Sequence, residues 1–513
     1  MAFVQYLLAD ERIPLKDRQD ALHRAFADPG IPAPVRESTP SYWFKDPHPQ
    51  LANIQSPELP QEADIVIIGS GITGTSVART LLEASDRSTI VNPKRPAVVM
   101  LEARDTCTGA TGRNGGHILE TVEEFAEWAD AYGLEAAKAV AQFRLAHLEE
   151  ILEVANEYGL TEEVQARKVQ FLSVYFDDER WREAVHSIQR FKECMPDESA
   201  EWKLIDKDEI HKAFSLPHAR GVVAGPAGAL WPYKLVTGIL SQLREKYSDS
   251  FRIETNTPVR AVSTDSSSAL RFTLNTPRGT IRARHIIHCT NAHVGHLVPE
   301  LRGRVYPIRG QMSAQNPGDK FICQAKKHSW IFNYDRGFDY LTQLPTDAQS
   351  AGKMMFGGGY AQGKAGGITD LGISTDSELS LYCDIHLSGA LSAIFGRENW
   401  GHVPGSETMM WTGNMGFSAD GLPWVGRLPS SEGLSHGAAN EGGAQWACCG
   451  FSGEGMVSAW LCGKAIAKMV SMHDRGHSGS GELSWFPKQM LVTEERIRSS
   501  VLPRSVIDKT SHV

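Results

Sequence analysis

The stretch Asp64-Ile-Val-Ile-Ile-Gly-Ser-Gly-Ile-Thr-Gly74 joins a short apolar run to three closely spaced glycines. The β-favouring residues Ile65–Ile68 predict a buried strand, and Thr75–Ala84 is compatible with a helix. A strand, a glycine-rich turn and a helix in this order are typical of a βαβ unit that binds a dinucleotide. We therefore expect the rest of the chain to be organised around residues 64–84.

Each glycine of this turn has a separate physical role. Gly69 permits a tight turn, Gly71 lets the backbone approach a pyrophosphate, and Gly74 lets the helix pack closely on the strand. The amides at the helix N-terminus and its positive dipole end then face the phosphates. The predicted cradle consists of Gly69, Gly71, Ile72, Thr73 and Gly74.

A second predicted strand, Ala97–Leu101, ends on the acidic Glu102. This acid lies farther from Gly74 than the usual spacing of about 20 residues. The polar insert Ser85–Pro96 accounts for the surplus as a longer loop. We predict that Glu102 binds the ribose hydroxyls of an adenosine; the alternative is a solvated carboxylate at a strand end.

Length and composition indicate a globular protein of two or three domains, with 513 residues, 41% hydrophobic and 22% charged. The net charge of −9 gives no reason to expect nucleic acid or an anionic membrane as a partner. No apolar run reaches the roughly 18 residues of a membrane span. The N-terminus lacks the apolar core of a signal peptide, so we expect a cytoplasmic protein. The final Ser-His-Val keeps a peroxisomal address open.

Eight scattered cysteines form no CxxC pair, so neither a metal site nor a thioredoxin-like motif is predicted. The adjacent Cys448 and Cys449 are expected in a core strand.

The order of expected elements suggests interleaved domains. Residues 1–60 read as an N-terminal arm with a helix near Lys16–Phe26 and a proline-rich leader anchored by Trp43 and Phe44. Helices are expected over Val122–Tyr158 with a break near Gly133, and over Asp178–Cys194, Asp208–Phe214, Pro232–Tyr247 and Glu378–Phe395. The glycine-rich Gly221–Trp231 is expected to be a turn region. Strands are expected at Gln170–Tyr175, Arg252–Ile253, Val259–Ser263, Ala269–Leu274, Thr280–His288, Met354–Gly359 and Trp446–Cys449.

These elements predict an α/β fold in which a Rossmann-type domain is interleaved with an α+β substrate domain built on an antiparallel sheet. The dinucleotide-binding segments are expected at 61–125, 216–298 and 405–475. The substrate domain is expected at 126–215 and 299–404, with a C-terminal tail at 476–513.

Six motifs in order resemble one flavoprotein family. They are Gly69–Gly74, Glu102-Ala-Arg104, Gly109–Gly116, Pro307–Gln311, Met354–Gly359, and Trp411–Pro423 leading to Gly450–Gly455. Together they resemble the D-amino-acid oxidase superfamily, especially its glycine oxidase, sarcosine oxidase and γ-glutamylputrescine oxidase branch.

The resemblance implies FAD as cofactor. The first glycine loop, Glu102, Ala103 and Arg104 would hold its ADP half, Val259 would border the adenine, and Thr290, Asn291 and Ala292 would follow the pyrophosphate. The loop Thr111, Gly112, Arg113, Asn114, Gly115 and Gly116 would lie against the isoalloxazine. Gly421, Gly453, Glu454, Gly455 and Met456 would border the flavin, with a helix N-terminus near N1 and O2 to stabilise negative charge. An acid at Glu454 is unfavourable there, so it is expected to point away or pair with a cation.

The implied reaction removes a hydride equivalent from a carbon beside an amine nitrogen and delivers it to flavin N5, after which water hydrolyses the imine. An amine or amino acid is therefore the expected substrate, as a secondary amine, an N-methyl amino acid or a polyamine. A low-dielectric aromatic pocket would favour the neutral amine. Candidate walls are Trp231, Tyr233, Trp330, Tyr334, Tyr340 and Trp411, of which Tyr340 and Trp411 fall in segments that flank the flavin in similar proteins. Core packing is the alternative for each aromatic side chain.

Three further residues are candidates for contact with substrate or flavin. Arg113 and Arg309 offer guanidinium groups to a substrate carboxylate; Arg309 has the alternative of pairing with a carboxylate between domains. His117 is a candidate base or flavin neighbour, with a hydrogen-bonded loop histidine as the alternative.

Two departures from the family pattern bear on the chemistry. Sarcosine oxidases attach FAD through a cysteine in the segment matching Met409–Trp411, where this chain has none, so we expect non-covalent FAD. Their oxygen-activating lysine matches Met355, and Lys353 lies two residues earlier on the same strand face.

Three alternatives stay open: an amine or D-amino-acid dehydrogenase with another electron acceptor, a flavin-binding scaffold or ring-forming tailoring enzyme, and an NAD(P)-dependent dehydrogenase.

Overall fold

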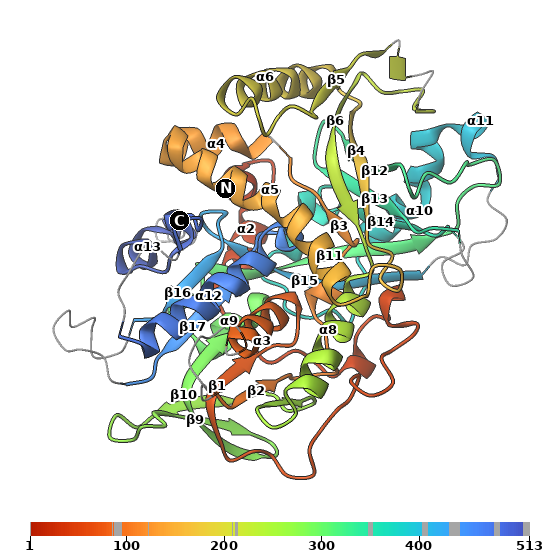
Figure 1. The fold of residues 1–513 in the computed structure, drawn as a ribbon. Coiled ribbons are helices and arrows are strands. Elements are labelled where there is room, and N and C mark those ends of the chain that lie inside the picture. Colours follow the sequence, from red (N-terminus) through yellow and green to blue (C-terminus); the bar gives the residue numbers. More distant parts are fainter. Residues whose placement is uncertain are drawn as a thin grey trace.

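Two β-sheets and the helices around them form the fold (Figure 1). The computed structural model describes residues 2–84, 86, 95–121, 123–207, 209–210, 214–346, 352–402, 409–429, 442–476 and 483–505. One sheet is largely parallel and carries the first glycine motif, and the other is largely antiparallel. The predicted fold class is thus confirmed.

The first sheet has the strand order β16-β17-β10-β1-β2-β7, with β9 and β8 continuing from β10. Its central strands run parallel, and α3 and α12 pack against each other over the sheet. The strands are β1 (Glu62–Ile68), β2 (Val98–Leu101), β7 (Phe251–Glu254), β8 (Ala261–Thr264), β9 (Phe272–Thr276), β10 (Gly279–His288), β16 (Trp424–Arg427) and β17 (Gln445–Cys449). The helices are α3 (Ile72–Ala84), α8 (Pro232–Lys246) and α12 (Ala459–Asp474).

The second sheet has the order β15-β11-β14-β13-β12-β4-β6-β3, with β5 beside β6. Its strands are β3 (His117–Ile118), β4 (Arg167–Tyr175), β5 (Lys203–Ile205), β6 (Gly221–Ala229), β11 (Val305–Gln315), β12 (His328–Asn333), β13 (Phe338–Gln343), β14 (Met354–Gly358) and β15 (Met409–Ser418). The associated helices are α4 (Glu123–Tyr132), α5 (Leu134–Glu157), α6 (Asp178–Cys194), α10 (Leu381–Phe395) and α11 (Arg397–Trp400).

Helix boundaries follow local signals. The predicted break at Gly133 separates α4 from α5, and Asp177 caps α6 by accepting from the amides of Glu179 and Arg180. α10 begins at Leu381, three residues later than predicted. The helix predicted over Asp208–Phe214 falls mainly outside the described residues, as does most of the insert Ser85–Pro96.

Three strands lie in the second sheet although the sequence placed their segments in the dinucleotide-binding domain. They are β3, β6 and β15. The chain crosses from one sheet to the other inside each of these segments, and strand partners distant in sequence decide the sheet.

The turn predicted for Gly221–Trp231 is wrong, because residues 221–229 form β6. Large side chains cover its glycines. A Cβ on Gly221 would lie 2.2 Å from the Trp181 ring, and one on Gly225 would lie 2.6 Å from the Phe171 ring. The glycines of β6 therefore leave room for large side chains that pack on the sheet, and they do not form a turn.

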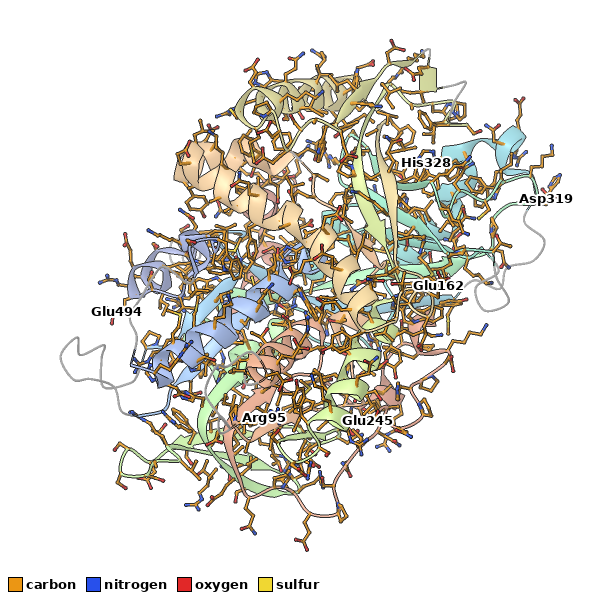
Figure 2. The ribbon with its side chains drawn as sticks, viewed as in Figure 1. Arg95, Glu162, Glu245, Asp319, His328 and Glu494 are labelled. Carbon is orange, nitrogen blue, oxygen red and sulfur yellow. The ribbon has the colours of Figure 1, made fainter. Side chains whose placement is uncertain are left out.

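The N-terminal arm packs on the body as predicted. It contains α1 (Ala2–Ala9), α2 (Leu15–Phe26) and the 3₁₀ turn η2 (Tyr42–Phe44). Trp43 is fully buried, and Phe44 packs against the largest core cluster. Many charged side chains lie on the surface, and Figure 2 labels the exposed Arg95, Glu162, Glu245, Asp319 and Glu494. Among the described helices, none is long and apolar enough to cross a membrane.

Candidate functional site

The first glycine turn has the geometry of a phosphate cradle. Gly69 has φ +112°, and a Cβ there would lie 2.8 Å from the carbonyl oxygen of Cys289. A Cβ on Gly74 would lie 2.0 Å from the carbonyl oxygen of Gly69. No described residue accepts a hydrogen bond from the amides of Gly71, Thr73 and Gly74. The turn thus keeps three unsatisfied donors at a helix N-terminus, where an anion is stabilised.

Glu102 is hydrogen-bonded to this turn. Its Oε2 accepts from the amide and hydroxyl of Ser70 at 3.0 and 2.6 Å, and its Oε1 accepts from the Arg104 amide at 3.0 Å. It is therefore not a solvated strand end. Val259, which is 4% exposed, belongs to a core cluster that includes residues of β1, β2, β9 and β10.

A second loop, residues 111–116, meets the first through Thr111. The Thr111 hydroxyl accepts from the Ile72 amide at 3.1 Å, and a Cβ on Gly71 would lie 2.9 Å from the same oxygen. We call residues 111–116 the Thr111–Gly116 loop. This contact joins the two loops that the sequence assigned to one cofactor.

Five consecutive carbonyls of the Thr111–Gly116 loop accept hydrogen bonds from separate donors. The donors to the oxygens of residues 112 to 116 are, in order, Ser41 Oγ at 2.8 Å, Trp411 Nε1 at 2.8 Å, Trp43 Nε1 at 2.6 Å, Thr342 Oγ1 at 2.7 Å and the Leu230 amide at 2.9 Å. The backbone amides of Asn114 and Gly115 have no acceptor in the described part of the chain. The protein thus supplies donors to the carbonyls of residues 112–116 and leaves the amides of Asn114 and Gly115 available as donors.

One face of the second sheet covers this loop. Met312 lies opposite Trp411 and Gly357, and Tyr340 lies opposite Gly357, so all four share a face. A Cβ on Gly115 would lie 2.6 Å from the Tyr340 ring. Tyr340 is half-buried, whereas Trp411 has no exposed surface and donates to the loop. Tyr340 and Trp411 therefore both contact the Thr111–Gly116 loop, and their roles toward a flavin or substrate stay predictions.

The closing glycine loop, by which we mean residues 450–456, is hydrogen-bonded to Asn291. The Asn291 side-chain oxygen accepts from the Gly450 amide at 3.0 Å, and Ala292 beside it is buried. The buried Thr290 hydroxyl has no partner among the described residues. The loop continues through Gly453 into a 3₁₀ turn over Gly455–Val457, which contains Met456 and leads into α12. Gly421 lies in the turn after β15 with φ +80°.

Glu454 pairs with a cation, as expected from its position. Its carboxylate lies 3.2 Å from Arg144, which also pairs with the buried Glu120 and with Glu124. Burial raises the pKa of Glu454 to about 7, although Arg144 opposes the shift. Burial also raises the pKa of Glu120 well above its ordinary value. Three carboxyl groups thus share one guanidinium beside the closing loop.

The described residues around Arg113 already occupy the guanidinium nitrogens that would bind a substrate carboxylate. Its guanidinium donates to the carbonyls of Thr108, Thr39 and Thr412 and to the Ser38 hydroxyl, and it is 3.1 Å from Asp376. Arg104 binds the same buried Asp376 at 2.8 Å. No local sequence signal marked Asp376, because its role arises only when distant segments meet.

Arg309 lies on the face of β11 opposite Met312, since three residues along a strand reverse the side-chain direction. It pairs with Asp370 at 2.7 Å, and because both residues lie in the predicted segment 299–404, this carboxylate is not one between the predicted domains. The hollow beside this pair has a volume of about 10 Å³, enough for roughly one water.

His117 is hydrogen-bonded, as its alternative interpretation has it, but it lies in strand β3 and not in a loop. It is hydrogen-bonded to Ser329 at 2.8 Å, and burial lowers its pKa to about 3, so the ring is neutral at physiological pH.

Of the two positions compared with the oxygen-activating lysine of similar proteins, position 355 carries a methionine and position 353 a lysine. Met355 is fully buried in the core. The Lys353 amine binds the Asn316 side chain at 2.5 Å. Lys353 also lies four residues from Gly357, about 13 Å along an extended strand.

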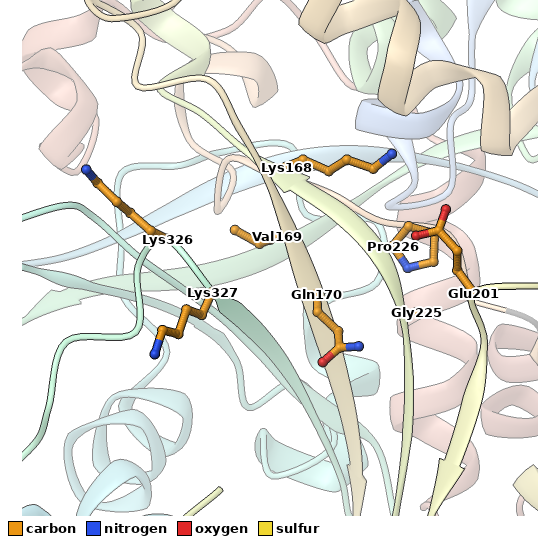
Figure 3. A pocket seen from close by; sticks show the side chains of 8 residues that line it. All are labelled: Lys168, Val169, Gln170, Glu201, Gly225, Pro226, Lys326 and Lys327. Atoms are coloured by element: carbon orange, nitrogen blue, oxygen red, sulfur yellow. The ribbon is translucent and has the colours of Figure 1, made fainter. Parts of the chain in front are cut away.

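A surface hollow of about 270 Å³ lies away from these loops (Figure 3). Strands β4 and β6 and the turn before β12 line it, and its polar rim consists of Lys168, Gln170, Glu201, Lys326 and Lys327. The hollow shares no residue with the first glycine turn or with the Thr111–Gly116 loop, so its size alone does not identify it as the reaction site.

The comparison with protein families decides the family. A family model described as FAD dependent oxidoreductase matches residues 64–469. The chain belongs to this family. The expected place in the D-amino-acid oxidase superfamily is confirmed, and FAD is the cofactor of this enzyme.

Individual relatives are distant. The chain is 21% identical to γ-glutamylputrescine oxidoreductase of Escherichia coli (strain K12) over 413 residues, 79% of this chain and 83% of that protein. Its fold is similar to glycine oxidase from Geobacillus kaustophilus, with TM-score 0.59, 15% identity and coverage of 85% of this chain and 99% of that one. L-proline dehydrogenase from P. horikoshii gives TM-score 0.60 at 19% identity, covering 84% and 98%.

Proposed function

We propose that this enzyme oxidises a C–N bond of an amine or amino acid, with a secondary amine, an N-methyl amino acid or a polyamine as the substrate class. The name of the relative γ-glutamylputrescine oxidoreductase supports an amine substrate. Bound FAD supplies the hydride acceptor, and the protein supplies binding, orientation and electrostatics.

The observation that carries this proposal is the pair of loops with unsatisfied amides. The amides at 71, 73 and 74 suit the pyrophosphate, and those at 114 and 115 suit the acceptor atoms of the flavin ring. Glu102 would hold the ribose side, whereas the guanidinium of Arg104 is bound to Asp376 and Thr108, and Thr290 offers a buried hydroxyl without a partner among the described residues. The residues present therefore fit FAD.

The half-buried Tyr340 is the aromatic wall we assign to the substrate side. An apolar wall disfavours the ammonium form and so favours the neutral, reactive amine. Trp411 and Arg113 act as positioning residues: Trp411 holds the Arg113 carbonyl, and Arg113 joins the loop to Thr39 and Thr412.

Non-covalent attachment of FAD is also part of the proposal. Cys107 and Cys289 are the thiols beside the first glycine turn, and burial raises the pKa of both well above the ordinary value. A thiol held protonated is a poor nucleophile for attachment to a ring carbon.

A dehydrogenase that uses another electron acceptor is the second candidate function. The buried Met355 and the Lys353–Asn316 hydrogen bond favour it, because neither position presents an ammonium group to the site.

The proposal is tested by mixing the purified holoenzyme anaerobically with N-methyl amino acids, D-amino acids and polyamines. Bleaching of the flavin absorbance by an amine supports the function, and failure of the whole panel to bleach it contradicts the function. Admitting oxygen to the bleached enzyme then separates the two candidates, since an oxidase recovers its absorbance and releases hydrogen peroxide.

A further inference from the structure

A short segment of the N-terminal arm contacts the Thr111–Gly116 loop from behind. We call residues 38–44 the N-terminal strap. The strap lies outside the region that the family model matches, which begins at residue 64. Ser41 and Trp43 are 2% and 0% exposed, so their contacts are shielded from water.

The strap supplies two of the five donors to the loop carbonyls. Ser41 donates to the Gly112 oxygen at 2.8 Å, and the Trp43 indole donates to the Asn114 oxygen at 2.6 Å. These two carbonyls flank Arg113, whose own carbonyl is held by Trp411. The peptide whose amide belongs to Gly115 is therefore oriented directly by Trp43, because a trans peptide directs its C=O and N–H to opposite sides.

Further contacts fix the strap itself. Thr39 accepts from Arg113 at 2.9 Å through its carbonyl and from the Thr412 amide at 2.9 Å through its hydroxyl. The Trp231 indole donates to the Trp43 carbonyl at 3.2 Å. The Phe44 ring occupies the space beside Gly112, where a Cβ would lie 2.5 Å from it. The strap is thus held by both the loop and the second sheet.

We propose that Trp43 and Ser41 are positioning residues for the flavin site. Trp43 aims the free Gly115 amide by holding the Asn114 carbonyl, and Ser41 fixes the start of the loop by holding the Gly112 carbonyl, whose own peptide amide, that of Arg113, already donates to the Ala110 carbonyl. This inference rests on the proposed function and adds a segment outside the family match to the cofactor site. If a donor is removed, its buried carbonyl must find water or another partner, and the loop shifts to do so. FAD affinity and the environment of the flavin ring then change together.

The test compares full-length Ser41→Ala and Trp43→Phe with wild type. The matched control is Arg24→Gln, because Arg24 also joins the arm to the body, through the carbonyls of Thr369 and Leu371 at 3.1 Å each, without touching the loop. Each protein is stripped of FAD and titrated with FAD by fluorescence quenching. The visible spectrum of each reconstituted protein and the melting temperature of each apoprotein are also recorded.

We expect each strap variant to raise the Kd for FAD about fivefold or more, as the loss of a donor to a buried carbonyl implies, and to shift the flavin bands. Arg24→Gln should lower the melting temperature of the apoprotein and leave the Kd and the bands unchanged. Strap variants with wild-type Kd and bands, or a control that changes the Kd equally, would overturn the inference. If Trp43→Phe does not fold, Ser41→Ala alone decides. Wild-type protein that takes up no FAD would instead contradict the proposed function.

Discussion

At the scale of single residues, the sequence identified polar residues as candidates for the site. The residues that surround each candidate in the structure decide its role. Arg113 and Arg309 carry the right group for a substrate carboxylate, yet Asp376 and Asp370 already pair with them. Residue type and local spacing cannot reveal such partners, because Asp376 and Asp370 lie far away in sequence. For Glu454 the sequence left two outcomes open, pointing away or pairing with a cation; the structure shows a pair with Arg144, a partner that no local pattern indicated.

Glu454→Gln is predicted to change how stability depends on pH. Burial raises the folded-state pKa of Glu454 from 4.5 to about 7. Its contribution to stability is therefore fully present below about pH 4.5 and is lost as pH rises through about 7. Relative to Glu454→Gln, the wild-type melting temperature should fall between pH 5 and 8. The exposed Glu495→Gln is the control, and parallel curves for wild type and Glu454→Gln would refute the prediction.

At the scale of elements, the strand–turn–helix at 62–84 was predictable because all its determinants are local. The strand β6 was not, because glycine density alone also favours turns. The aromatic rings that pack on the glycines of β6 are Trp181 of α6, Phe171 of β4 and Trp202, which lies just before β5. Sequence position gives no sign that these rings meet at β6.

Gly225→Ala should therefore destabilise the protein. Its added methyl would lie 2.6 Å from the Phe171 ring, and such overpacking typically costs about 1–3 kcal/mol. Urea denaturation measures the loss. The control is Gly389→Ala in α10, where no atom lies within 4 Å of the new Cβ and helix propensity favours alanine. Equal stability of wild type and Gly225→Ala would show that β6 is not packed as described.

At the scale of the whole molecule, the site depends on segments from the full length of the chain. Asp376 joins three of them: it pairs with Arg104 and Arg113, and its carbonyl accepts from Thr39 of the N-terminal arm. The interleaving of the two sheets was predictable from the order of the expected helices and strands. The sheet to which β3, β6 and β15 belong was not predictable, since strand pairing is a long-range property.

Asp376→Asn is predicted to cost about 3–5 kcal/mol, because it leaves two buried guanidinium groups without a counter-charge. The free energy of unfolding in urea measures the effect. Asp130→Asn is the control, since Asp130 is 72% exposed in its pair with Arg190 and such surface pairs contribute about 0–1 kcal/mol. A loss for Asp376→Asn no larger than that of the control would contradict the role of Asp376.

The central claim is that the two loops hold FAD without a covalent bond, and the absorbance of the purified protein before and after denaturation tests it most directly. We predict a yellow protein with flavin bands near ~370 and ~450 nm, whose entire flavin stays in the supernatant as intact FAD when the chain is precipitated. A colourless protein that takes up no added FAD, or flavin that precipitates with the chain, would contradict the account.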